Sequence, residues 1–164
     1  MRYYLEENFR WFKADGQLYN EAGDEVYYYE NRGLFLPRID LYKYDVNIWH
    51  VQTRFSWVRA IYDLIYGSET VGTLNSRLQF IRSTLDIEGL GWRVEGDIFS
   101  YNFDIINENG IIIAHMDQKI FHMTQHFTIE IFDEDNEELI VLLVLAINQY
   151  DKQRKAAASA AAVH

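Results

Sequence analysis

The feature that most constrains the fold is an unbroken apolar run, Leu139–Ile147, near the end of an otherwise mixed and acidic chain. A transmembrane helix needs about 20 apolar residues, so this run is too short to cross a bilayer. Acidic residues precede the run and basic residues follow it, which matches the polarity of a helix dipole. Because no Gly or Pro interrupts the chain up to Lys155, the pattern predicts a helix over 137–155, with Asp135 or Asn136 as its N-cap.

The chain ahead of this helix repeats one pattern, in which two short strands are joined by a turn. The copies place one Leu or Ile at intervals of roughly 20 to 24 residues, which marks a repeated structural unit. Hairpins at short and regular spacing predict an all-β sandwich or barrel. The aligned residues are Leu18, Leu41, Leu64, Leu85, Ile105 and Ile129.

A mainly β fold that encloses one helix satisfies both observations. The apolar run has no polar face, so the first half of the helix is expected to be buried on every side. An antiparallel sheet closed around it leaves no exposed strand edge. We therefore expect a closed antiparallel barrel of about twelve strands around a central hydrophobic C-terminal helix. The expected single domain covers residues 1–155, and residues 156–164 form an Ala-rich tail.

The composition narrows the functional classes. The chain carries a formal net charge of −10, which argues against binding to nucleic acid and disfavours contact with anionic membrane surfaces. It contains no cysteine, which excludes a disulfide, a thiolate zinc site and a cysteine nucleophile. Its first residues lack the apolar core of a signal peptide, and no transmembrane segment is visible, so we expect a cytoplasmic protein.

One region of the sequence resembles a known family. Residues 92–121, followed by a further strand and the apolar helix, resemble the LURP-one-related family, which belongs to the tubby-like and phospholipid-scramblase-like group. The matching positions are Trp92, Gly96, Asp97, Phe99, Phe103, Ile105 and Ile147. Asn102 and Asn148 depart from the family pattern, which usually has acidic residues there. The resemblance implies a tubby C-terminal-like fold, which is a twelve-stranded barrel around a C-terminal helix.

An acidic segment just ahead of the helix is a candidate metal site. Asp133, Asp135 and Glu137 offer oxygen ligands of the kind that calcium prefers. The resemblance implies a weak divalent-cation site here, because scramblases have an acidic calcium segment in a similar position. A solvated turn that complements the helix dipole explains the same acids. The sequence leaves both interpretations open.

Histidines and catalytic motifs give no sign of an active site. His122 and His126 are four residues apart, a separation that spans about 13 Å in a strand and is too long for one metal ion. His115 lies upstream of them. The chain has no Gly-x-Ser-x-Gly elbow and no glycine-rich phosphate or dinucleotide loop. We therefore expect a protein that is not an enzyme and needs no cofactor.

Two functions are consistent with these observations. The first is a binding or scaffold module that recognises a protein partner. The second is a lipid- or phosphoinositide-responsive, membrane-associated module, which rests on analogy with the tubby-like and scramblase-like group. Lipid headgroups require clustered cations, and the candidates are scattered along the sequence, so we favour the protein partner. These candidates are Arg54, Arg59, Arg77 and Arg82.

Overall fold

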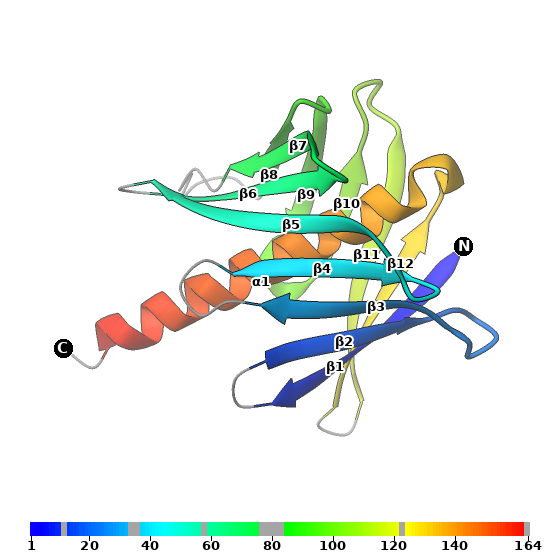
Figure 1. The fold of residues 1–164 in the computed structure, drawn as a ribbon, viewed down its shortest axis with the longest axis horizontal. Helices are drawn as coiled ribbons and strands as arrows, with labels where there is room; N and C mark the ends of the chain where they lie inside the picture. The colour runs from blue at the N-terminus through cyan, green and yellow to red at the C-terminus, as the bar shows by residue number, and fades with distance from the viewer. Residues whose placement is uncertain (11–12, 33–36, 57–58, 76–83, 122–123, 163–164) are drawn as a thin grey trace.

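The protein consists of twelve β-strands and one long helix, with two short 3-10 turns between them. The computed structural model describes residues 1–10, 13–32, 37–56, 59–75, 84–121 and 124–162 (Figure 1). The elements are β1 (Arg2–Arg10), β2 (Lys13–Tyr19), β3 (Glu25–Arg32), β4 (Arg38–Lys43), β5 (Val46–Ser56), β6 (Arg59–Tyr66), β7 (Glu69–Asn75), β8 (Thr84–Glu88), β9 (Trp92–Asp97), η1 (Ile98–Ser100), β10 (Asn102–Ile106), β11 (Ile112–Phe121), β12 (Thr124–Ile131), η2 (Glu134–Asn136) and α1 (Glu137–Ala162).

The strands form a closed antiparallel barrel in which each strand pairs with the next one along the chain. The first and last strands close it, with Arg2 opposite Glu130 and Leu5 opposite Phe127. Closure leaves neither strand with an unpaired long edge, which removes the usual route to edge-to-edge aggregation. This architecture confirms the mainly β barrel expected from the sequence.

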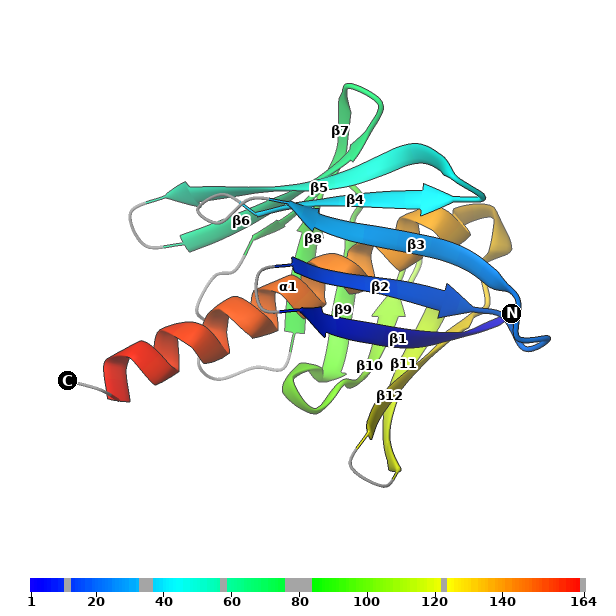
Figure 2. The ribbon, with the colours of Figure 1, turned by 60° about the horizontal axis from the view of Figure 1, so that its bottom comes forward.

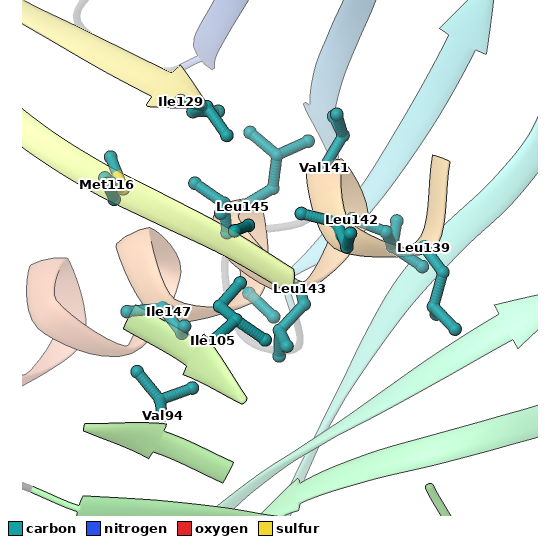
Figure 3. Packing of buried hydrophobic residues seen from close by; sticks show 14 of the residues in the cluster. Val94, Ile105, Met116, Ile129, Leu139, Val141, Leu142, Leu143, Leu145 and Ile147 are labelled. Carbon is teal, nitrogen blue, oxygen red and sulfur yellow. The ribbon is translucent and has the colours of Figure 1, made fainter. Parts of the chain in front are cut away.

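Helix α1 passes through the inside of the barrel (Figure 1, Figure 2). Residues 139–151 are all buried, which confirms the prediction that the apolar run is covered on every side. The inward faces of the strands supply the cover, and Figure 3 shows Val94, Ile105 and Ile129 among the side chains around the helix. The helix is therefore part of the hydrophobic core.

The repeated Leu and Ile positions are the inward contacts of every second strand. They lie on β2, β4, β6, β8, β10 and β12, which all run in the same direction. All six side chains are buried. The spacing found in the sequence therefore measures the length of one hairpin, since two antiparallel strands and their turns separate equivalent residues.

The barrel has two open rims, which differ in their connections. We call the end where α1 begins the proximal rim and the end from which α1 leaves the distal rim. The proximal rim is formed by the segments 20–24, 44–45, 67–68, 89–91, 107–111 and 132–136. Four of these six segments contain acidic residues, and none contains Lys or Arg.

The helix is longer than its sequence predicted. It begins at Glu137, as expected, but it continues beyond Lys155 to Ala162. Residues 155–162 are exposed, and the last turns of α1 project beyond the barrel (Figure 2). Alanine has the highest intrinsic helix propensity, which accounts for helix without packing in this segment. Among the described residues there is no helix with the length and apolar content to cross a membrane.

Candidate functional site

The start of α1 is held by a buried polar cluster at the proximal rim. Glu137, the first helical residue, is 8% exposed. Its carboxylate accepts hydrogen bonds from the hydroxyl of Tyr3 at 2.8 Å and from the hydroxyl of Tyr27. The ammonium of Lys43 lies 3.3 Å from the same carboxylate. Three strands, β1, β3 and β4, therefore fix the position of the first helical turn.

This arrangement changes the proton affinity of each member of the cluster. Burial alone would raise the pKa of Glu137, but the hydrogen bonds from Tyr27 and Tyr3 and the charge of Lys43 outweigh it and hold that pKa below its usual value. Burial and the bond to Glu137 raise the pKa of Tyr27 and Tyr3. The cluster therefore consists of a carboxylate, an ammonium ion and two neutral phenols at neutral pH.

The next helical residue extends this attachment to a fourth strand. Glu138 lies 3.3 Å from the Lys43 ammonium and accepts a hydrogen bond from the Trp49 indole at 3.0 Å. The Trp49 ring lies 4.8 Å from the ring of Tyr66, measured between centroids. The proximal end of the helix is thus tied to β5 as well, beneath an aromatic pair at the rim.

The three acids predicted as metal ligands do not point to one centre. Glu137 is directed into the barrel, toward Tyr3 and Tyr27. Asp133 accepts a hydrogen bond from the side chain of Asn136 at 2.8 Å, and Asp135 is exposed. Across the described residues, no group of three or more His, Cys, Asp or Glu side chains is arranged to hold a metal ion. The divalent-cation site stays a prediction that this structure does not strengthen.

The histidines have different surroundings. The imidazole of His115 on β11 lies 2.7 Å from the carboxylate of Asp104 on β10, and both side chains are partly exposed. His126 occupies a place on β12 opposite Lys119. His122 lies outside the described residues. His115 also lines a depression of about 210 Å³ on the barrel wall, between β1, β11 and β12.

A group of exposed apolar side chains at the proximal rim has no counterpart in the sequence predictions. We call Met1, Ile111, Ile112 and Phe132 the apolar corner; their exposed fractions are 49%, 59%, 46% and 55%. They come from the ends of β1, β11 and β12, which are neighbours in the barrel. The sequence positions of Ile111 and Phe132 could have predicted this group. Each residue lies at an acidic turn instead of continuing the alternating pattern of a strand.

A second exposed set lies elsewhere on the same rim. Tyr44, Val46 and Tyr66 are 71%, 56% and 50% exposed, and they border the ends of β4, β5 and β6. Most of the large apolar side chains found exposed among the described residues thus lie at the proximal rim. Exposed apolar surface that is gathered in one region is typical of an interaction site.

The distal rim holds α1 through a second buried carboxylate. Asp151 is fully buried and accepts a hydrogen bond from the Tyr101 hydroxyl at 2.7 Å. Its charge is balanced by Arg154 at 3.2 Å and Lys155 at 2.7 Å, both on α1 itself. Asn148, one turn earlier, lies 2.9 Å from the same Tyr101 hydroxyl. These contacts neutralise the buried Asp151 carboxylate where the helix leaves the core.

The comparison with family models decides the relationship suggested by the motif around Trp92. A model described as LURP-one-related matches residues 1–148. The chain belongs to the LURP-one-related family. The closed barrel is consistent with the link between this family and the tubby-like group. A search of curated proteins and a search of solved structures find no match.

The LURP-one-related motif has a structural explanation in this barrel. Gly96 has a φ of +128°, and a Cβ there would approach the Asn102 carbonyl oxygen to 2.8 Å, so a larger residue cannot be accommodated without a shift. Asp97 accepts a hydrogen bond from the Ser100 backbone amide at 3.1 Å and caps η1. Phe99, on that turn, lies 3.8 Å from the Arg154 guanidinium. The motif thus shapes the β9–β10 connection and its contact with the helix.

Proposed function

We propose that this LURP-one-related barrel is a non-enzymatic binding or scaffold module whose partner is a protein that contacts the outside of the barrel. The observation that carries the proposal is the filled interior. Residues 139–151 of α1 are buried against inward side chains from the strands. A barrel of this kind offers its outer wall and rims to a partner, because its inside is already packed with side chains.

The buried polar groups support a role without catalysis. Glu137 and Asp151 are the buried carboxylates of α1, and each is engaged by groups that position the helix. Catalytic acids and bases are instead expected in a cleft where a substrate can reach them. The two polar clusters are therefore best explained by their contribution to the fold.

The pairing of cations favours a protein over an anionic lipid as the partner. Phosphate headgroups are recognised by free, clustered Lys and Arg. Many cations of the described part of the chain already lie within 4 Å of a carboxylate. They are Arg2, Arg32, Arg38, Lys43, Arg54, Arg93, Arg154 and Lys155.

Of the four arginines that the sequence offers as candidates for lipid binding, the described residues include two. Arg54 and Arg59 lie on the two strands of the β5–β6 hairpin, where Arg59 is opposite Ser56 and Arg54 is opposite Ile61. The Arg54 guanidinium is bound by Asp63. Arg77 and Arg82 lie outside the described residues. A lipid-responsive module, the second candidate function, would need these groups to act together.

A comparison of two binding assays tests the proposed function. The purified chain is incubated with liposomes that contain phosphatidylserine or phosphoinositide, with and without calcium, and sedimented. In parallel, the tagged chain is cross-linked in the cells that produce it. We expect a specific protein adduct and no sedimentation with liposomes in the absence of calcium. Calcium-independent sedimentation without any protein adduct would favour the lipid-responsive module instead.

A further inference from the structure

We infer that the apolar corner of the proximal rim is the docking surface for a protein segment that presents apolar side chains flanked by Lys or Arg. The inference rests on the proposed function and adds the surface and the chemistry of the partner. It is carried by three observations, which are the rigidity of the corner, its exposed apolar side chains and the sign of the surrounding charge.

The corner is built on a fixed backbone. The Ile131 amide donates a hydrogen bond to the Met1 carbonyl at 2.7 Å, and the Phe132 amide donates to the Ile113 carbonyl at 2.9 Å. These bonds join the start of β1, the start of β11 and the end of β12 at one place on the rim. A surface whose backbone is already ordered loses little conformational entropy when a partner binds.

The apolar side chains of the corner are exposed, although residues of the hydrophobic core lie directly beside them. Single exposed apolar residues are normal on protein surfaces, but a local group of them indicates an interaction site. Ile111, Ile112 and Phe132 are about half exposed although buried residues such as Ile113 and Ile131 are their immediate neighbours. The core is thus complete beneath these three side chains, and they are available to a partner. The fourth member, Met1, also contacts the core, because its sulfur lies 2.7 Å from the Tyr3 hydroxyl.

The connections beside the corner carry negative charge, whereas the Met1 ammonium at the corner itself is bound by the Ile131 carbonyl oxygen at 2.8 Å. Glu108, Glu134 and Asp135 are exposed in the two connections that contain Ile111 and Phe132. Neither connection contains Lys or Arg. Arg2, which follows Met1, is paired with Glu130 at 3.2 Å and lies 3.9 Å from Glu21. A complementary partner therefore carries positive charge beside its apolar side chains, and charge of this sign also accelerates its approach.

The closed sheet restricts how such a segment can bind. A barrel in which β1 pairs with β12 has no free strand edge at the corner, so a peptide cannot extend the sheet by main-chain hydrogen bonds. The partner must dock by its side chains, as an amphipathic helix or a turn does. An anionic lipid surface is disfavoured here because Glu108, Glu134 and Asp135 would repel it.

A peptide-binding measurement tests the chemistry of the corner. The probe is a synthetic amphipathic peptide of Leu and Lys, and its affinity for the full chain is measured by fluorescence anisotropy. The controls are the same peptide with Glu in place of Lys, and with Ser in place of Leu. We expect only the Leu–Lys peptide to bind, and we expect its affinity to fall at about 1 M salt, where the Debye length is about 3 Å. Equal binding of the Glu peptide would overturn the inference.

Matched variants locate the binding. Ile111→Ser combined with Phe132→Ser should weaken peptide binding at least about tenfold, as expected when central contact residues are removed. Phe55→Ser changes a side chain of similar exposure near the distal end of β5 and should leave the affinity unchanged. The melting temperature of each variant is measured first. We expect it to equal that of the wild type, because the substituted side chains are exposed. An unchanged affinity in the folded double variant would overturn the inference.

Photo-crosslinking in cells separates this inference from the proposed function. A photoreactive phenylalanine analogue is placed at Ile112 in one chain and at Phe55 in another. Adducts at position 112 whose cross-linked segment contains apolar residues next to Lys or Arg support the inference. Adducts only at position 55, or a second copy of the chain at position 112, overturn it and leave the protein-binding function standing. No adduct at these or other surface positions would overturn both.

Discussion

The two ends of α1 each contain a buried carboxylate, but the charges that balance them come from different parts of the chain. At the proximal rim, Glu137 is bound by Tyr3, Tyr27 and Lys43, all from barrel strands. At the distal rim, Asp151 is balanced by Arg154 and Lys155, which follow it on the same helix.

The difference indicates which ion pairs depend on the helix being inside the barrel. Contacts between Glu137 and three strands exist only when α1 is inside the barrel in the observed position. The ion pairs of Asp151 are local and can form whenever the helix is formed. We therefore expect the Lys43 ion pair to depend on the helix being seated in the barrel, and the Asp151 ion pairs mainly to neutralise a buried charge. At the distal end it is hydrogen bonds, such as the one from Tyr101 to Asp151, that join the helix to the barrel.

The largest effect is expected from substitutions in the middle of α1, between its two ends. Leu143 is fully buried. Leu143→Lys should prevent stable folding, because an unpaired buried charge costs several kcal/mol in a domain whose net stability is about 5–15 kcal/mol. Leu143→Met should cost less than about 1.5 kcal/mol, since it conserves volume and polarity. Thermal unfolding followed by circular dichroism measures both, and similar melting temperatures for the two variants would contradict a buried helix.

Removing each carboxylate compares the two ends directly. Glu137→Ala should destabilise the protein by about 3 kcal/mol, because it leaves the Tyr3 and Tyr27 hydroxyls buried without this acceptor. Asp151→Ala should cost about 1–2 kcal/mol, since Tyr101 keeps Asn148 within reach and Arg154 and Lys155 are partly exposed to water. Urea denaturation gives both free energies of unfolding. A larger loss for Asp151→Ala would reverse the assignment of the two ends.

The stability that Glu137 contributes at the proximal rim should depend on pH. The pKa of Glu137 lies below its ordinary value of 4.5 in the folded protein, so its ionised form stabilises the fold at neutral pH. That contribution is lost as the pH falls below about 4.5 and through the folded-state pKa. The stability difference between wild type and Glu137→Gln should therefore shrink on acidification. Tyr27→Phe removes one hydrogen bond that lowers this pKa and should weaken the dependence, whereas a constant difference down to pH 3 would contradict the geometry.

The smallest effect is expected beyond the distal rim. Residues 156–162 are helical and exposed, and they follow the last residues that contact Asp151. A chain that ends at Lys155 should melt within about 2 °C of the full chain, since a surface change without packing is usually worth less than 0.5 kcal/mol. A drop of ten degrees would show that the Ala-rich segment packs against the barrel.

Local patterns explain why much of this fold was predictable. Leu18, Leu64 and Ile129 recur at the length of a hairpin, and the spacing alone identifies them as equivalent inward positions. The apolar run at 139–147 could only be buried. The end of the helix at Ala162 was missed because exposed alanines form helix without the apolar periodicity that marks a packed one.

The site could not be predicted in the same way, because its contacts join distant parts of the chain. Glu137 meets Tyr3 and Tyr27 only after the barrel closes, and no local pattern in the sequence links them. The acids at 133–138 look alike in the sequence, yet the fold directs Glu137 inward and leaves Asp135 exposed. Assignments that depend on where a side chain points require the register of the whole barrel.

Hydrogen–deuterium exchange most directly tests the central claim that α1 belongs to the core. Amides that open only with global unfolding exchange most slowly, whereas frayed or exposed segments exchange early. We predict that residues 139–150 exchange as slowly as the central residues of β5 and β6, and that residues 156–162 exchange much faster. If residues 139–150 exchanged well before those strands, the helix would leave a barrel that remains folded, and the account of a helix-filled core would be wrong.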